Sequence, residues 1–141
     1  MKKVGVVLVN YKDYAKRFLA ECRDSLRSQT YRDFKVYIVD NASSQESFDY
    51  LKDAYPEAFV IARGDGNYSA ANNAGAKAAI ADGAEVLVIA NMDTAFDEGW
   101  LSELVAALES GASIGIAQSK ILVYPETVSY THLTLPTILR V

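Results

Sequence analysis

The sequence has few of the residues on which many catalytic and extracellular proteins depend. Among 141 residues there is one cysteine, Cys22, and one histidine, His132. A single cysteine cannot form an intrachain disulfide, so the chain is not a disulfide scaffold and a reduced, cytoplasmic setting is expected. Because His132 lies in a C-terminal segment that looks foreign, we also expect no histidine triad and no HExxH zinc site.

Long hydrophobic runs and excess positive charge are also missing. The opening apolar run, residues 4–9, is far shorter than the roughly 20 residues of a membrane span, and it lacks a signal-peptide cleavage pattern. The formal charge is -4 and the sequence pI is about 4.9. We therefore expect no transmembrane segment and no nucleic-acid partner. The expected location is cytoplasmic, with the inner membrane face as the alternative, reached by peripheral association of the full-length protein.

The end of the chain differs in character from the rest. Residues 128–137 read VSYTHLTLPT, which resembles the conceptual translation of a transposon-end adapter used in preparing sequencing libraries. A native threonine-rich strand and loop is the alternative. We therefore expect residues 1–127 to be the domain, residues 128–141 to be a non-native tail, and the chain to be truncated where this tail begins.

Valine-rich apolar runs alternate with amphipathic segments along the rest of the chain. The runs have the length of strands buried on both faces of a sheet, and the segments between them repeat apolar residues at steps of three and four. This alternation predicts an α/β fold, a three-layer α/β/α domain with a mostly parallel, Rossmann-like sheet. The predicted strands are residues 3–10, 35–40, 59–63, 85–90 and 114–117. Four helices are expected between them. The first begins at Tyr14, the second follows a Ser43–Glu46 capping box, the third covers residues 69–81 and ends at Gly83, and the fourth lies around residues 101–108.

Polar residues at the strand ends are the candidates for function, since ligands of such sheets bind beyond the carboxyl ends of the strands. Tyr11 could stack on a planar base, or be an exposed loop tyrosine. Asp40 could accept hydrogen bonds from a ribose or a base, or turn the chain with Asn41. Asp93 could hold a divalent cation together with substrate phosphates, or cap the helix that begins near Asp97.

The third strand and the helix after it add further candidates. Arg63 could pair with a diphosphate, or be a solvated strand end. Asparagine is a poor residue inside helices, yet three lie at the start of the alanine-rich segment: Asn67, Asn72 and Asn73. One of them can cap the helix, and the others either position a ligand or are simply exposed. The sequence contains neither a GxxxxGK[ST] phosphate loop nor a GxGxxG turn, which disfavours ATPases and dinucleotide-binding enzymes.

Taken together, these segments resemble family 2 glycosyltransferases, which are nucleotide-sugar-dependent enzymes of the GT-A fold. The likeness covers about residues 3–125, and it is carried in order by VGVVLVNYKDY, LRSQTYRDFKVYIVDNAS, RGDGNYSAANNAG, VLVIANMDT and EGWLSELVAAL. The resemblance implies inverting transfer of a sugar from a UDP- or dTDP-linked donor to a hydroxyl of a carbohydrate or lipid-linked acceptor, as in polysaccharide biosynthesis. VDNAS and NMDT resemble a rhamnosyltransferase-like branch.

The resemblance also implies roles for individual residues. Asp93 stands in for the last aspartate of the family's DxD motif and would hold Mg²⁺ or Mn²⁺, while Asn91 occupies the first position of that motif as a neutral residue. The family's catalytic base and acceptor site come from a later segment, so no catalytic residue is assigned. The residues implied to bind the nucleotide sugar are Val9 and Tyr11 beside the base, Asp40 on the nucleoside, and Arg63, Asn67, Asn73 and Asn91 along the diphosphate and sugar.

Two other functional classes were weighed from the sequence. The first is a non-catalytic nucleotide-binding or interaction module derived from half of a transferase domain, which would bind nucleotides without transferring sugar. The second is a phosphoacceptor receiver domain. That fold requires acidic residues directly after the first strand, where this chain has Asn10 and Tyr11, so it is disfavoured.

Overall fold

The computed structural model describes residues 1–123, 128–130 and 137–140. Strands and helices alternate up to α4, as the hydrophobic pattern predicts. Among the described residues, no helix combines the length and the apolar character that crossing a bilayer would require. The elements are β1 (Val4–Tyr11), α1 (Tyr14–Arg27), β2 (Phe34–Asn41), α2 (Gln45–Ala54), β3 (Phe59–Ala62), α3 (Tyr68–Ala81), β4 (Val86–Ile89), α4 (Trp100–Glu109), β5 (Ile116–Gln118), β6 (Ile121–Val123), β7 (Val128–Tyr130) and β8 (Thr137–Arg140).

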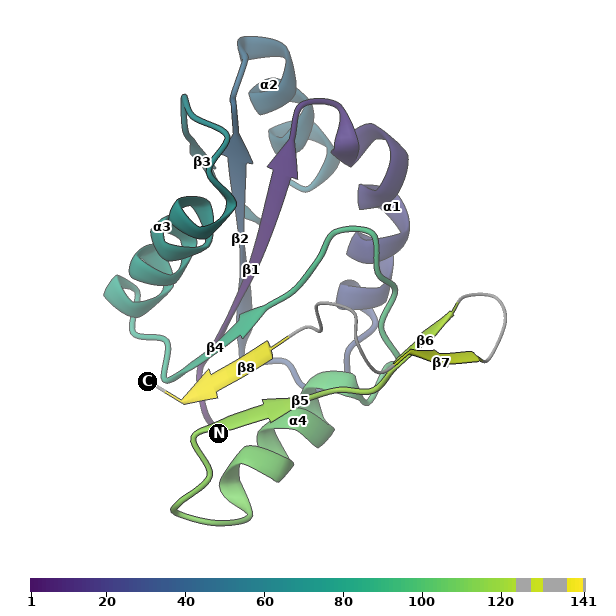
Figure 1. Ribbon diagram of the computed structural model, residues 1–141, viewed down its shortest axis with the longest axis vertical. Helices are drawn as coiled ribbons and strands as arrows, with labels where there is room; N and C mark the ends of the chain where they lie inside the picture. Colours follow the sequence, from purple (N-terminus) through teal and green to yellow (C-terminus); the bar gives the residue numbers. More distant parts are fainter. Residues whose placement is uncertain (124–127, 131–136, 141) are drawn as a thin grey trace.

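The main sheet has the order β3-β2-β1-β4-β8-β5, and its first four strands are parallel (Figure 1). The predicted parallel α/β architecture is therefore confirmed for these four strands. The fifth predicted strand, residues 114–117, starts two residues later than expected, and it pairs antiparallel with β8 instead of extending the parallel sheet. β8 also runs antiparallel to β4, and β6 pairs with β7 in a separate two-stranded sheet.

Helices cover both faces of the parallel sheet, with α3 on one side and α1 on the other (Figure 1). Successive residues of a strand point to opposite faces. Val6 and Leu8 of β1 accordingly join the large core cluster formed with α1, α2 and α4, whereas Val7 packs with Ala71 of α3. The valine-rich runs are continuous because both faces of these strands are buried.

The alanine-rich helix α3 lies very close to the sheet, as its small side chains predict. A methyl group added at Gly75 of α3 would overlap Val7 of β1. One added at Gly5 would lie 2.6 Å from the Cβ atom of Ala79. This close approach fixes the position of the first turn of α3 relative to the ends of β1 and β4. Gly83, with φ of 90°, follows the C-cap of α3 in the left-handed conformation that a glycine at this place allows.

The capping box that opens α2 lies one residue later than the sequence pattern indicates. Ser44 is the N-cap, and its hydroxyl and that of Ser47 each accept a hydrogen bond from the other residue's backbone N–H. Ser43 does not cap, because its hydroxyl donates instead to the Asp40 carboxylate at 2.6 Å. The prediction of a Ser43–Glu46 box was therefore wrong, since the pattern could not reveal the competing buried acceptor.

Candidate functional site

A cavity of about 450 Å³ lies at the carboxyl ends of β1, β2 and β4, beside the first turns of α1 and α3. We call it the strand-end cavity. Its place matches the region where ligands of parallel α/β sheets bind. The residues that line it are Val9, Tyr11, Tyr14, Asn41, Gly66, Tyr68, Asn91, Met92 and Asp93.

Tyr11 and Asn41 lie opposite each other in the β1–β2 register. The Tyr11 ring is 48% exposed, whereas Asn41 is only 1% exposed. The Oδ1 atom of Asn41 is buried without a hydrogen-bond partner among the described residues. An unpaired buried acceptor costs free energy, and a ligand that donates to it recovers that cost. The cavity therefore has an aromatic face, and its wall contains a buried acceptor without a partner among the described residues.

Both strand ends are followed at once by a residue in the left-handed conformation. Lys12 has φ of 55° and Ala42 has φ of 52°. Non-glycine residues adopt this conformation at a cost of about 1–2 kcal/mol, so neighbouring contacts must hold it. The Asn10 side-chain amide donates to the Lys12 carbonyl at 3.0 Å, and the Ala42 N–H donates to the Asp65 carbonyl at 2.8 Å. These turns follow the two residues, Tyr11 and Asn41, that line the strand-end cavity.

Asp40 lies behind the cavity wall and is fully buried. Its carboxylate accepts hydrogen bonds from the Asn10 amide at 3.0 Å, the Ser43 hydroxyl at 2.6 Å and the Ser47 hydroxyl at 2.7 Å. Asn10 in turn accepts a bond from the Ala15 N–H at 2.8 Å. Asp40 thus joins the end of β1 to the start of α2, while its neighbour Asn41 is the residue that faces the cavity.

The loop after β4 supplies the polar wall of the cavity through Asn91 and Asp93. Asn91 is half-buried, and its Oδ1 atom accepts a hydrogen bond from the Tyr68 hydroxyl at 3.0 Å. Asp93 is exposed and lies beside Tyr14. Burial, the hydrogen bond to Asp93 and the negative charge of Asp93 raise the pKa of the Tyr14 hydroxyl to about 12. Tyr14 therefore stays neutral and can donate to the carboxylate. Helix α4 begins beyond this loop, with Gly99 as its N-cap, so Asp93 is not a helix cap.

No three histidine, cysteine, aspartate or glutamate side chains of the described residues come together as a metal site. Mg²⁺ and Mn²⁺ nevertheless need only one or two carboxylates when water and substrate phosphates supply their other oxygen ligands. Asp93 offers one exposed carboxylate on the wall of an open cavity. This donor set fits a cation that binds together with a diphosphate, and it does not fit a cation held by protein ligands alone.

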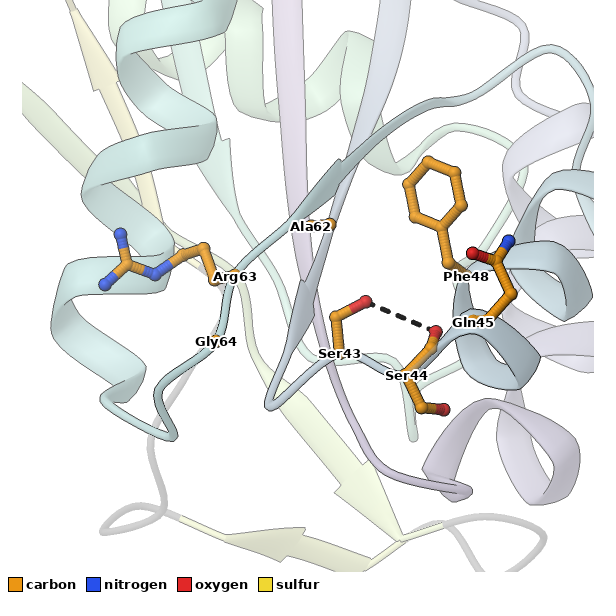
Figure 2. A pocket seen from close by; sticks show the side chains of 7 residues that line it. All are labelled: Ser43, Ser44, Gln45, Phe48, Ala62, Arg63 and Gly64. Atoms are coloured by element: carbon orange, nitrogen blue, oxygen red, sulfur yellow. Dashed lines mark hydrogen bonds between the residues drawn. The ribbon is translucent and has the colours of Figure 1, made fainter.

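A second cavity of about 460 Å³ lies between β3 and the start of α2, and we call it the edge cavity. Figure 2 shows Ser43, Ser44, Gln45 and Phe48 on one side of β3, whereas the Arg63 side chain extends to the other side, toward α3. The Arg63 Nη2 atom donates to Asp65 at 2.8 Å. The remaining lining residues are Ala62 and Gly64.

The other predicted site residues lie along α3 and its approach. Asn67 is the N-cap of α3, and its side chain accepts a hydrogen bond from the Ala70 N–H at 2.9 Å. Asn73 is exposed on the helix, and Asn72 has a buried Oδ1 atom without a partner among the described residues. The structure therefore brings Val9, Tyr11, Asn91 and Asp93 together in one cavity and leaves Asp40, Arg63, Asn67 and Asn73 outside its lining.

Several cavity residues were not recognised as candidates from the sequence. Tyr14 was assigned to the apolar face of the first helix, and Asn41 was considered only as a turn partner of Asp40. Tyr68 directly follows Asn67, which the sequence did indicate as a candidate, so the prediction missed Tyr68 by one position. Met92 is 1% exposed and forms the floor between two predicted polar residues. Cys22 is buried, and burial together with the charge of Asp93 raises the pKa of its thiol to about 12.

Comparison with known proteins gives one family match. The profile described as Glycosyl transferase family 2 matches residues 5–140. The match includes most of the segment 128–141, so the foreign origin of that segment stays a prediction. No curated protein sequence matches the chain significantly.

Solved structures of low identity share the fold. S. aureus TarS 1-349 has a TM-score of 0.67 and 17% identity, covering 98% of this chain and 47% of that chain. A mannosyltransferase from Pyrobaculum calidifontis, solved with GDP-Man and Mn²⁺, has a TM-score of 0.63 and 19% identity, covering 82% of this chain and 34% of that chain. A 4-diphosphocytidyl-2C-methyl-D-erythritol synthase has a TM-score of 0.69 and 12% identity, covering 99% of this chain and 76% of that chain.

The chain thus spans less than half the length of the two transferases. Its parallel sheet and alternating helices are those of the GT-A nucleotide-binding domain. Members of the matched family transfer sugars from nucleotide sugars and invert the anomeric centre. With a profile match over nearly its whole length, the chain belongs to glycosyl transferase family 2.

Proposed function

We propose that the strand-end cavity binds the nucleoside diphosphate of a sugar donor, and that the chain is the donor-binding part of an inverting glycosyltransferase. The observation that carries this proposal is the register that places the exposed Tyr11 opposite Asn41 at the ends of adjacent strands. The Oδ1 atom of Asn41 is buried without a partner in the part of the chain that the structure describes. A nucleobase offers a flat face to the Tyr11 ring and an N–H donor to Asn41, whose buried oxygen would turn toward the cavity to accept it. Val9 packs beside them on the same wall.

The diphosphate is proposed to lie toward the loop after β4, where Asn91 and Asp93 contribute the polar wall. A divalent cation, Mg²⁺ or Mn²⁺, would bind Asp93 and neutralise the charge that builds on the leaving diphosphate as the sugar departs. Asp93 holds its carboxylate beside the Tyr14 hydroxyl, which keeps the side chain on the cavity wall. The mannosyltransferase of similar fold was solved with GDP-Man and Mn²⁺, which supports a nucleotide-sugar donor and a divalent cation for a chain of this fold.

Asp40 and the residues of β3 and α3 are proposed to act around this cavity. Asp40 supports the turns that carry Tyr11 and Asn41, in addition to its predicted role at the nucleoside. Arg63, Asn67 and Asn73 are proposed to line the nucleotide-sugar side, as the family resemblance implies. The acceptor is proposed to be a hydroxyl of a carbohydrate or a lipid-linked glycan, at the cytoplasmic side of the cell, and TarS, solved with UDP-GlcNAc, supports a UDP-linked donor.

Isothermal titration of the 141-residue chain with UDP, dTDP and GDP, each with and without Mn²⁺, tests this function. We expect binding of at least one diphosphate that strengthens with Mn²⁺. The enhancement by Mn²⁺ should disappear in Asp93→Ala. The matched control is Asp53→Ala, which removes an exposed carboxylate of α2 away from the cavity. Binding of none of the three diphosphates, or equal Mn²⁺ enhancement in wild type and Asp93→Ala, would contradict the proposal.

A further inference from the structure

The first residue of α3, Tyr68, and the second residue after β4, Asn91, are joined by a hydrogen bond at the strand-end cavity. The Tyr68 hydroxyl donates a hydrogen bond to the Oδ1 atom of Asn91 at 3.0 Å. The two residues are 23 positions apart in sequence, and both line the cavity. Tyr68 is 45% exposed, so its ring lies at the rim while its hydroxyl reaches the polar wall.

This bond decides which part of the Asn91 side chain can act on a ligand. An asparagine side chain has one oxygen, which accepts hydrogen bonds or ligates cations, and one NH₂ group, which only donates. In Asn91 the oxygen is engaged by Tyr68. The oxygen has a second lone pair but is turned toward Tyr68, whereas the NH₂ group makes no hydrogen bond among the described residues and can donate to the oxygens of a phosphate.

Asp93, two residues further on, has the opposite character. Its carboxylate can only accept hydrogen bonds or bind a cation, and its tyrosine neighbour, Tyr14, is a donor. The two polar residues of the loop thus each have a tyrosine beside them, from α3 and from α1. In this loop Asn91 therefore acts as the hydrogen-bond donor toward a ligand, and Asp93 acts as the acceptor or cation ligand.

We propose that Tyr68 is a positioning residue that holds the Asn91 oxygen away from any cation and presents its amide N–H₂ group to the diphosphate of the bound nucleotide. This inference rests on the proposed function of the strand-end cavity. It predicts that the wild-type chain binds a diphosphate partly through a neutral hydrogen bond, so that part of its affinity is independent of Mn²⁺.

Calorimetric titration of the 141-residue chain with UDP and with uridine, in the absence of Mn²⁺, tests the inference. Tyr68→Phe keeps the aromatic ring and removes only the hydroxyl that orients Asn91. We expect UDP affinity to fall about threefold to tenfold, the effect of one hydrogen bond, while uridine affinity is unchanged. Tyr50→Phe, which removes a tyrosine hydroxyl on α2, is the matched control and should bind both ligands as wild type does.

A second variant, Asn91→Asp, tests the same inference through charge. Without Mn²⁺ the new carboxylate should repel the diphosphate and lower UDP affinity more than tenfold, since like charges oppose each other at close range. Adding Mn²⁺ should restore UDP binding, so the enhancement by Mn²⁺ should exceed that of wild type by at least about tenfold.

Three results would overturn the inference. Tyr68→Phe and Tyr50→Phe could bind UDP equally well, which would show that the hydroxyl does not orient Asn91 for the diphosphate. Tyr68→Phe could bind Mn²⁺ more weakly than wild type in the absence of nucleotide, which would show that the Asn91 oxygen, held by Tyr68, is already a cation ligand. A wild-type chain that binds none of UDP, dTDP and GDP would overturn the proposed function as well, whereas the first two results leave that function standing.

Discussion

The strand-end cavity and the edge cavity have nearly the same volume, about 450 and 460 Å³, but their polar atoms differ in availability. In the edge cavity the Ser43 hydroxyl is bound to Asp40, and that of Ser44 is bound within the capping box of α2. The Arg63 Nε atom is buried without a partner among the described residues, but that side chain extends away from the two serines, toward α3 (Figure 2). In the strand-end cavity the Asn41 oxygen is unpartnered among the described residues, and Tyr11 is half exposed. The strand-end cavity therefore differs from the edge cavity in having an unused acceptor beside an exposed aromatic ring, and not in volume.

Asp40 binds side chains from both regions, so its removal should lower the free energy of unfolding more than the other substitutions do. Asp40→Ala leaves the Asn10 amide and the Ser43 and Ser47 hydroxyls without their buried acceptor. We expect the free energy of unfolding to fall by about 3 kcal/mol, measured by urea denaturation. Asp53→Ala, an exposed carboxylate of α2, should change it by less than about 0.5 kcal/mol. A loss of stability no greater than in this control would mean that the network does not join the two regions.

Substitution of Asn41 tests which of the two cavities binds the nucleotide. Asn41→Ala removes the unpartnered acceptor, so we expect nucleoside diphosphate affinity to fall about tenfold with little loss of stability. Gln45→Ala makes a similar change of an amide at the edge cavity and should leave affinity unchanged. Titration calorimetry and urea denaturation of both variants measure the difference. If Gln45→Ala lowered affinity and Asn41→Ala did not, the nucleotide would belong to the edge cavity.

Ser44 tests whether the edge cavity is purely structural. Ser44→Ala removes the N-cap of α2 and should cost about 1 kcal/mol of stability without changing nucleotide affinity. Ser69→Ala, a serine of α3 that is not the N-cap, is the control for the substitution itself. Thermal denaturation and a nucleotide titration give both quantities, and a drop in affinity would show that the edge cavity takes part in binding.

Modification of Cys22 should have the smallest effect on nucleotide binding, because its thiol is buried in the core on α1 and lines neither cavity. Its raised pKa of about 12 leaves on the order of a thousandfold less thiolate at pH 8 than an ordinary cysteine has. We expect a thiol reagent to label Cys22 in urea but not in the native chain, with or without UDP. Rapid labelling of the native chain would mean that the core around α1 opens readily.

The fold was largely predictable because hydrophobic periodicity reports burial directly. The valine-rich runs of β1 and β2 and the alanine-rich α3 follow from local pattern alone. The pairing of β5 with β8 could not be predicted in this way, since antiparallel partners far apart in sequence leave no local signal. The displaced cap of α2 has the same origin, because Asp40 competes for Ser43 from another element.

The candidate site was predictable only at the level of the strand ends. Tyr11 and Asp93 follow apolar runs, so topology alone brings them to one edge of the sheet. Which of two adjacent residues faces the cavity depends on the strand register and on the left-handed turn at Ala42. The sequence therefore pointed to Asp40, while the side chain on the cavity wall is that of Asn41. The contact between Tyr68 and Asn91 depends on how closely α3 packs, which no local pattern encodes.

Nuclear magnetic resonance titration of the ¹⁵N-labelled chain with UDP and Mg²⁺ tests the central claim most directly, because it reports on both cavities at once. The account predicts that the side-chain amides of Asn41 and Asn91 and the backbone amide of Tyr11 shift with the bound fraction, while the Gln45 side chain and Gly64 do not. Shifts confined to Gln45 and Gly64, with Asn41 and Asn91 unmoved, would contradict it.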